Sequence, residues 1–222
     1  MRTAAADVHR LAEALSTVRL GLFGGTFDPP HVGHLLAASD AFETLRLDRI
    51  AFIPAASQPF KHGVVAASAS ERLAMVRLLV GDDPRFVIDP IEIDRGGLSY
   101  TVDTLSEYAA RDPATERFLL IGEDLADQIA TWRQPERIAT LAQVVVLVRG
   151  QHAEGVSSGR HAHGASGSAD RDAPVLPLVR IATRRVDLSS SEIRDRVRAG
   201  RPLRGFVTEA VAEYIRAAAL YR

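Results

Sequence analysis

Hydrophobic residues in this chain gather in short continuous runs, and between the runs apolar residues recur every three or four positions. Continuous apolar runs of five or so residues are typical of β-strands that are covered on both faces. On this pattern we predict six strands, at residues 19–24, 50–54, 86–89, 118–122, 144–148 and 178–182.

Helical periodicity fills the segments between these strands. Ser68 and Glu71 form a capping-box pattern that predicts a helix start, and Gly81 predicts its end. Apolar stripes at helical spacing comprise Leu35, Ala38, Phe42 and Leu45 in one segment and Val102, Leu105 and Ala109 in another. The alternation of strands and helices predicts an α/β fold with a Rossmann-like, doubly wound, mostly parallel sheet, helices on both faces and right-handed crossovers.

Two segments fall outside this alternation. Residues 1–18 form an N-terminal extension in which Val8, Leu11 and Leu15 have the spacing of a short amphipathic helix. An extra helix and a wrongly chosen start codon both remain open for it. Residues 151–173 are rich in Gly, Ser, Ala and His, and such a composition buries too little apolar surface to offset the entropy of ordering. We expect a disordered surface loop there, within a main domain that spans residues 19–222.

The composition narrows the classes of function. The 27 basic and 28 acidic residues nearly balance, which argues against a protein that mainly grips nucleic acid or an anionic membrane. The chain has no cysteine, so it has no disulfides, thiolate nucleophile or cysteine-bound metal, and we expect it in the reducing cytoplasm. No apolar run is long enough to cross a membrane. The oligomeric state stays open, and a homo-oligomer is compatible with the sequence.

The most informative stretch is residues 21–35, which read GLFGGTFDPPHVGHL. A predicted strand ends at Gly24 and Gly25, and His31 and His34 stand three residues apart at the start of the next helix. Glycines allow a ligand to approach the backbone, and a helix start offers unpaired N–H groups to phosphate. The string matches neither the dinucleotide-binding glycine pattern nor the phosphate loop of Walker-type ATPases. The role of Asp28 within this string stays open.

These residues resemble the signature of the HxGH nucleotidyltransferases, and specifically the nicotinate mononucleotide adenylyltransferases. Residues 188–200, LSSSEIRDRVRAG, resemble the second signature of this superfamily, in which a Ser/Thr-rich turn and an Arg one helical turn later contact the ATP phosphates. Leu188 and Ser191 depart mildly from the usual Ile and Thr. Taken alone, Ser189 and Glu192 could also form a simple capping box.

Three further matches point to the pyridine nucleotide as second substrate. Residues 99–105 resemble a SYTxxTL segment of the family that holds the nicotinate ring and its carboxylate. Residues 121–124 resemble an IGxD turn that holds adenosine. Residues 131–132 resemble a TW pair that stacks on the pyridine. Lys61 stands near a basic position of the family, and a solvated surface lysine is the alternative for it. The resemblance covers residues 19–222 apart from 151–173.

The resemblance implies that ATP and nicotinate mononucleotide are the substrates, with Mg²⁺ bound through the ATP phosphates and no metal-binding residues in the protein. It implies His31, His34 and Arg194 as catalytic residues. The implied ATP site comprises Gly24, Gly25, Thr26, Phe27, His34, Gly122, Asp124, Ser189, Ser190, Ser191 and Arg194. The implied nicotinate mononucleotide site comprises Tyr100, Thr101, Thr104, Trp132 and Lys61. A pantetheine-phosphate adenylyltransferase, a cytidylyltransferase and a non-catalytic nucleotide-binding regulator are the alternatives.

Overall fold

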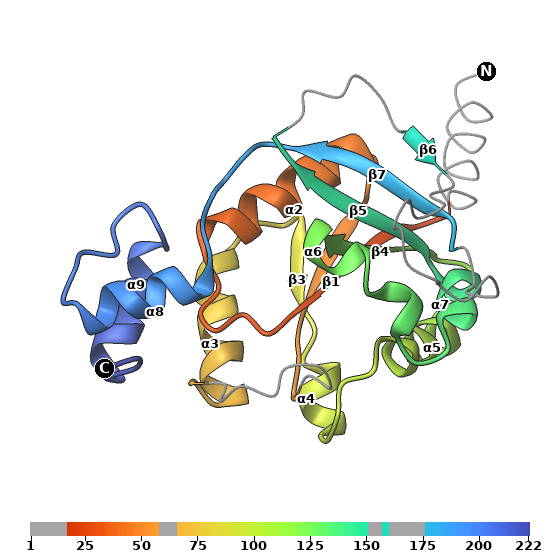
Figure 1. The fold of residues 1–222 in the computed structure, drawn as a ribbon. Coiled ribbons are helices and arrows are strands. Elements are labelled where there is room, and N and C mark those ends of the chain that lie inside the picture. Colours follow the sequence, from red (N-terminus) through yellow and green to blue (C-terminus); the bar gives the residue numbers. More distant parts are fainter. Residues whose placement is uncertain (1–16, 58–65, 151–156, 160–175) are drawn as a thin grey trace, which may run out of the picture.

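The computed structural model describes residues 17–57, 66–150, 157–159 and 176–222. A single twisted sheet runs through the molecule, with helices packed against it (Figure 1). The predicted N-terminal helix, Lys61 and most of the predicted 151–173 loop lie outside the described residues.

The sheet has seven strands in the order β3-β2-β1-β4-β5-β7-β6. The first six strands in this order run parallel to one another, and β6 is antiparallel to the strand beside it, β7. The strands are β1 (Arg19–Gly25), β2 (Arg49–Pro54), β3 (Phe86–Ile88), β4 (Glu116–Gly122), β5 (Gln143–Arg149), β6 (Ser157–Gly159) and β7 (Leu178–Thr183). All six predicted strands and the mostly parallel, doubly wound fold are confirmed.

Two hydrophobic layers cover the two faces of the sheet. Helices α2 (Val32–Thr44) and α3 (Ala69–Val80) bury Ala38, Ala41 and Val76 against one face. Helices α4 (Ile91–Arg95), α5 (Thr101–Arg111) and α7 (Pro135–Leu141) cover the opposite face. This double covering explains the continuous apolar runs, because the central strands meet a helix on either side.

A third hydrophobic cluster lies beyond α3. It joins α3 to α8 (Ser190–Arg198) and α9 (Glu209–Ala217), which form a lobe at one end of the molecule (Figure 1). Ile193, Val211 and Ile215 are its buried centre. The connection from β7 to α8 crosses the carboxyl edge of the sheet, so it brings the second signature motif back towards the loop that follows β1.

Local signals set the helix ends as expected. The Ser68 and Glu71 side chains form the capping box that starts α3, and Gly81, with φ of 60°, ends it. Short helical turns α6 (Glu123–Ala126) and η1 (Ile129–Thr131) follow β4. No helix in the described part of the chain has both the length and the apolar composition needed to span a membrane.

One described segment departs from the prediction. Residues 151–173 were expected to lack regular structure, yet Ser157–Gly159 pair with β7 as strand β6. Pairing at a sheet edge uses backbone N–H and C=O groups, so it needs none of the aliphatic side chains whose absence motivated the prediction.

Candidate functional site

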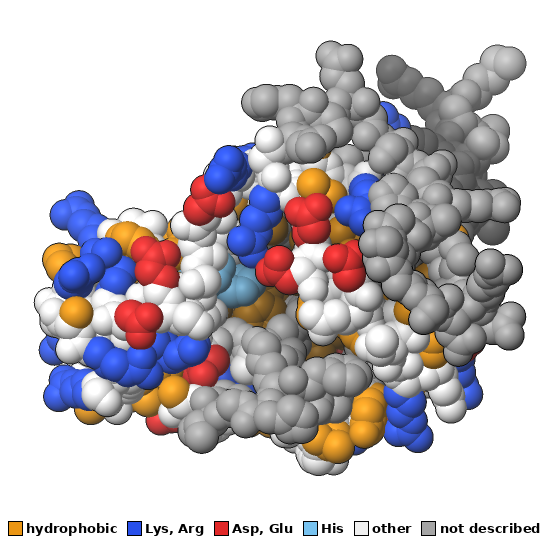
Figure 2. Space-filling view, viewed as in Figure 1, with side chains coloured by type: hydrophobic (Ala, Val, Ile, Leu, Met, Phe, Trp, Pro, Cys, Tyr) orange, Lys and Arg blue, Asp and Glu red, His pale blue; other side chains and the backbone are white. Residues whose placement is uncertain are grey.

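The predicted site residues lie at the carboxyl edge of the sheet. After β1 the chain builds outward to β2 and β3, and it then returns to place β4 on the other side of β1. The loops after β1 and β4 therefore diverge, which creates the crevice where open α/β sheets bind their ligands. In Figure 2 this face is hollowed at its centre, and histidine surface lies in the hollow, where His31 and His34 are the only described histidines.

The loop after β1 is shaped by close packing. A Cβ atom on Gly25 would lie 2.9 Å from the Phe27 ring, so this position admits no side chain. The Phe27 backbone is left-handed, with φ of 54°, and its ring is buried with its centroid 5.0 Å from that of His34. The buried Phe27 ring therefore packs against the His34 ring and supports it from the protein interior. The buried ring leaves only the backbone of Phe27 to contact ATP, and that contact stays a prediction.

His31 and His34 lie against each other at the start of α2. Their ring centroids are 3.7 Å apart, and the His31 backbone N–H donates to His34 Nδ1 at 3.1 Å. Because His34 Nδ1 accepts this bond, the proton of the neutral His34 ring lies on Nε2. Gly33 is required between them, since a Cβ atom there would lie 2.9 Å from His31 Nδ1.

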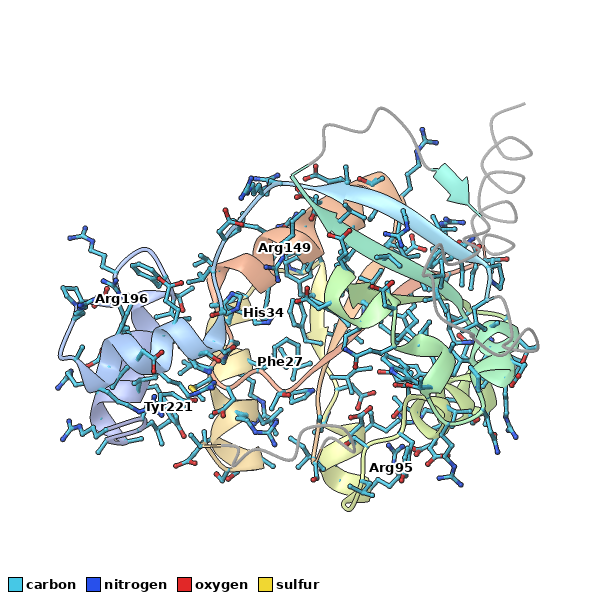
Figure 3. The ribbon with its side chains drawn as sticks, viewed as in Figure 1. Phe27, His34, Arg95, Arg149, Arg196 and Tyr221 are labelled. Carbon is cyan, nitrogen blue, oxygen red and sulfur yellow. The ribbon has the colours of Figure 1, made fainter. Side chains whose placement is uncertain are left out.

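The His31 ring is held neutral. It is 6 % exposed, and burial, followed by the positive charge of Arg149, lowers its pKa from 6.5 to about 4. Its Nδ1 is buried and has no hydrogen-bond partner in the described parts of the chain. Arg149, the last residue of β5, lies on the same side of the site as His34 (Figure 3). The pair thus offers neutral imidazole donors beside a cation.

The Ser-rich turn is joined directly to the histidine loop. Ser190 Oγ donates to the Pro29 carbonyl at 2.8 Å, and the Arg194 guanidinium donates to the Asp28 carbonyl at 2.7 Å. Ser189 Oγ accepts from the Glu192 N–H at 3.1 Å, so it caps α8. Arg194 also donates to Ser191 Oγ at 3.1 Å. Two signatures about 160 residues apart in the chain therefore form one surface.

Two buried charged residues hold this surface together. The carboxylate of Asp28 accepts from the backbone N–H groups of Ala66 and Ala67 and, at 2.8 Å, from the Tyr221 hydroxyl. Arg72, which is 2 % exposed, donates to the carbonyls of Thr26, Ala56 and Ala67. The sequence left the role of Asp28 open. Its carboxylate anchors the loop to the C-terminus.

The predicted pyridine-binding residues form a second group across the crevice. Tyr100 and Thr101 begin α5, and Trp132 ends η1 close by. The Arg133 guanidinium lies 4.8 Å above the Tyr100 ring and forms an ion pair with Asp103 in the first turn of α5. The Trp132 indole N–H is buried without a hydrogen-bond partner among the described residues.

Thr104 belongs to this segment but not to its surface. The residue is 4 % exposed, and its hydroxyl donates to Glu92 at 2.7 Å and accepts from Arg95 at 3.0 Å. A hydroxyl engaged in this way has no donor left for a substrate. These contacts give Thr104 a supporting position beneath the turn, and a direct contact with the mononucleotide stays a prediction.

The remaining predicted residues lie between the two groups. Gly122 ends β4 and is the N-cap of α6, and Asp124 is exposed two residues further on. Gly24 is open, since a Cβ atom there would have the Ile53 carbonyl oxygen, at 4.0 Å, as its nearest neighbour. Within the described residues, no group of three or more His, Asp or Glu side chains could hold a metal ion.

Sequence reasoning missed Arg72, Glu92 and Arg149. Arg72 is an ordinary charged residue in a predicted helix, and Glu92 lies between the predicted strand at residues 86–89 and the next predicted helix. Arg149 follows a predicted strand, and that position alone could have marked it, because strand ends at the carboxyl edge face the ligand. Nothing comparable distinguishes Arg72 or Glu92, since their burial depends on distant parts of the chain.

Comparisons with known proteins agree with this geometry. The cytidylyltransferase-like family matches residues 22–196. A Gemmatimonas aurantiaca protein named "Probable nicotinate-nucleotide adenylyltransferase" is 46 % identical over 205 residues, which cover 92 % of this chain and 93 % of that protein. A Thermus thermophilus protein of the same name is 42 % identical over 92 % of this chain and its own full length.

Solved structures share the fold. The Plasmodium falciparum nicotinic acid mononucleotide adenylyltransferase complexed with NaAD superposes with a TM-score of 0.66 at 16 % identity, covering 92 % of this chain and 97 % of that one. The same enzyme complexed with APC gives a TM-score of 0.68 at 15 % identity, with the same coverage. With these relatives and this site, the chain belongs to the nicotinate-nucleotide adenylyltransferases of the cytidylyltransferase-like family.

Proposed function

We propose that this protein joins nicotinate mononucleotide to the AMP moiety of ATP, giving nicotinate adenine dinucleotide and pyrophosphate, as a step of NAD synthesis. The observation that carries the proposal is the stacked pair His31 and His34, joined to the Ser-rich turn of α8 at the switch point of the sheet. The names and sequence identities of its relatives support the same reaction.

The reaction is an in-line displacement. An oxygen of the mononucleotide phosphate attacks the α-phosphorus of ATP, the bond to the bridging oxygen breaks, and pyrophosphate leaves with its electron pair. The attacking phosphate is already an anion, so it needs neither a strong general base nor a covalent enzyme intermediate. Catalysis then consists of positioning and of stabilising the charge that develops around the α-phosphorus.

The histidines suit this electrostatic role. His34 presents its Nε2–H while its Nδ1 is fixed by the His31 backbone, so the donor is oriented before the substrate arrives. His31 is neutral because of its lowered pKa and therefore donates without adding charge to the buried loop. The His34 ring packs against Phe27 and Phe23, and the His31 ring lies against His34, which limits the movement of both rings.

The cations around the crevice suit the β- and γ-phosphates. Arg194 uses two guanidinium N–H groups to hold Asp28 and Ser191, and its other N–H groups can donate to phosphate oxygens. Arg149 lies at the same edge and, among the described residues, forms no ion pair with a carboxylate. Lys61 stays a predicted further cation, and Gly122 and Asp124 are proposed to hold adenosine.

The proposal includes Mg²⁺ carried by the ATP phosphates, where it would neutralise charge on the triphosphate. Mg²⁺ usually keeps several waters and binds through substrate phosphates, so a dedicated set of protein ligands is unnecessary. The absence of cysteine favours the cytoplasm as the place of action.

Pyrophosphate release from MgATP tests the proposal when measured with a panel of acceptors. Nicotinate mononucleotide should support turnover, and nicotinamide mononucleotide should do so less well. If 4′-phosphopantetheine is the better acceptor, or CTP the better donor, the protein is another nucleotidyltransferase. If ATP binds but no acceptor releases pyrophosphate, the protein is a non-catalytic nucleotide-binding regulator.

A further inference from the structure

A buried carboxylate lies beneath the pyridine side of the site, and the reaction described above does not use it. Glu92 of α4 is 8 % exposed, and burial raises the pKa of its carboxyl group. Thr104 donates a hydrogen bond to Glu92 at 2.7 Å, and the Ser99 hydroxyl is a second hydrogen-bonding partner. Buried carboxyl groups are costly unless they are well bonded, so this arrangement calls for an explanation.

The contacts of Glu92 form a bridge between α4 and α5. The Arg95 guanidinium, labelled in Figure 3, donates to Thr104 at 3.0 Å and pairs with Glu107 at 2.5 Å. The Thr104 hydroxyl is thus fixed from two sides, by Glu92 as acceptor and by Arg95 as donor. The bridge leaves little freedom for the start of α5 to move relative to α4.

Ser99 and Thr104 flank the turn formed by Tyr100 and Thr101. Tyr100 begins α5 without a side-chain cap, whereas Ser68, Ser189 and Thr208 cap helices α3, α8 and α9 with their hydroxyls. The position of the turn therefore depends on contacts beneath it. Ser99 supplies them by donating its N–H to the Ser57 carbonyl at 2.8 Å and accepting from the Ala56 N–H at 3.0 Å.

We infer that Glu92 is a positioning residue for recognition of the pyridine nucleotide. By holding Ser99 and Thr104, it fixes the backbone of Tyr100 and Thr101 opposite Trp132, and this sets the affinity for nicotinate mononucleotide. This inference rests on the proposed function. Binding groups must be held to within roughly 0.5 Å of their productive geometry, and residues that do not touch the ligand commonly provide that support.

Glu92→Gln is the variant that tests this inference. Glutamine keeps the size of the side chain and one acceptor oxygen. Its NH₂ group cannot accept a hydrogen bond, so the variant loses one of the two hydrogen bonds that Glu92 accepts from the Thr104 and Ser99 hydroxyls. We expect the KM for nicotinate mononucleotide to rise about tenfold, while the KM for ATP and kcat stay within about twofold. Thr104→Val, which breaks the same bond from α5, should give the same pattern.

Two controls separate positioning from general stability. Glu107→Gln removes the other acid of the bridge, which pairs with Arg95 but does not touch the turn, and its KM values should stay within about twofold of the wild type. Thr104→Ser restores the hydroxyl and should restore the KM that Thr104→Val loses. Thermal unfolding of each variant shows whether it is folded, and Thr104→Val carries the test if Glu92→Gln does not fold.

The outcomes distinguish this inference from the proposed function. A wild-type enzyme that releases no pyrophosphate with nicotinate mononucleotide contradicts the proposed function. An active wild type, together with a folded Glu92→Gln or Thr104→Val variant that keeps the wild-type KM for the mononucleotide, overturns the role of Glu92. An equal rise in both KM values also overturns it, because it indicates a general loss of structure.

Discussion

The two sides of the crevice are built in different ways. The phosphate side joins four segments that are far apart in the chain, through Asp28, Arg72, Arg194 and Tyr221. The pyridine side comes almost entirely from residues 89–133, where α4, α5 and η1 follow one another. The phosphate side thus depends on long-range contacts between buried charges, whereas the pyridine side depends on local helix geometry.

This difference fits the two ligands. A triphosphate carries several charges, and stabilising a transition state on it requires donors fixed in advance from several directions. A pyridine ring with one carboxylate needs a flat surface and a few oriented N–H groups. Damage to the phosphate side should therefore reduce stability and turnover together, while damage to the pyridine side should alter substrate recognition and leave the fold largely intact.

The largest expected effect comes from Arg72→Met. The methionine fills part of the space but leaves the carbonyls of Thr26, Ala56 and Ala67 without their donor and Asp28 without its neighbouring charge. Breaking a buried charged contact in this way costs about 3–5 kcal/mol. We expect the free energy of unfolding, measured by urea denaturation, to fall by that amount and adenylyl transfer to be nearly lost.

Arg77→Met is the matched control for this change. Arg77 lies on the exposed side of the same helix, α3, so its loss should change the free energy of unfolding by less than about 0.5 kcal/mol. Equal destabilisation by the two substitutions would show that α3 is merely sensitive to methionine. The phosphate side would then not depend on the buried guanidinium.

His34→Ala should mainly reduce the rate. Loss of one preorganised donor to a developing charge typically lowers kcat by a factor on the order of 10²–10³. The His34 ring also packs on Phe27, so some loss of stability is expected, but less than for Arg72→Met. Single-turnover kinetics with saturating MgATP measure the rate, and kcat near the wild-type value in a folded variant would contradict the role of His34.

Acidification should destabilise the phosphate side through His31. Its folded pKa of about 4 lies below the unfolded value of 6.5, so the unfolded state binds the proton more tightly. The contribution of His31 to the free energy of unfolding is therefore fully present above pH 6.5. It falls as the pH drops from 6.5 to 4 and does not change further below pH 4. At about 1.4 kcal/mol per pKa unit, the loss amounts to about 3 kcal/mol.

The contribution of His31 can be isolated with His31→Asn. Urea unfolding of both proteins at several pH values between 4 and 7 gives two stability curves, and their difference removes the titration of the carboxylates that they share. The variant should lack the fall that begins at pH 6.5. Parallel curves over this range would contradict a neutral, buried His31 in the folded protein.

The sequence predicted the fold, and it predicted a site whose main motifs the structure brings together. Continuous apolar runs gave all six parallel strands, and the capping box of Ser68 gave the start of α3. The two end motifs predicted the phosphate side, because glycine, histidine and serine at fixed spacing indicate a backbone and short side chains that can bind phosphate. These signals depend on residues that are close together in the chain, so they can be found in a single sequence.

The sequence did not show which side chains are buried, because burial is not a local property. Phe27 and Thr104 lie within recognised motifs, yet their side chains point into the protein, under His34 in one case and against Glu92 in the other. Arg72 looks like any helical arginine until Thr26 and Ala56 are folded over it. Sequence spacing alone does not tell which residue of a motif contacts the ligand and which supports its neighbour.

The smallest expected effect is on substrate choice, and it concerns the pyridine side alone. We expect nicotinate mononucleotide to be preferred over nicotinamide mononucleotide by at least roughly tenfold in kcat/KM. The first turn of α5 has no side-chain cap, so its backbone N–H groups and positive dipole end are available to a carboxylate. An amide would turn an NH₂ group towards the same donors, and an unpaired donor costs about 1–3 kcal/mol, or roughly ten- to a hundredfold.

Thr101→Ala sharpens this prediction, because it removes a side chain from the turn and leaves the backbone donors in place. Part of the preference should therefore survive in the variant. The measurement is kcat/KM for the two mononucleotides side by side under saturating MgATP, in the wild type and in Thr101→Ala. Equal efficiency in the wild type would show that the α5 turn does not select for the carboxylate, and the protein would be a dual-specificity enzyme. Complete loss of the preference in Thr101→Ala would place the selection in the threonine hydroxyl instead of the backbone of the helix start.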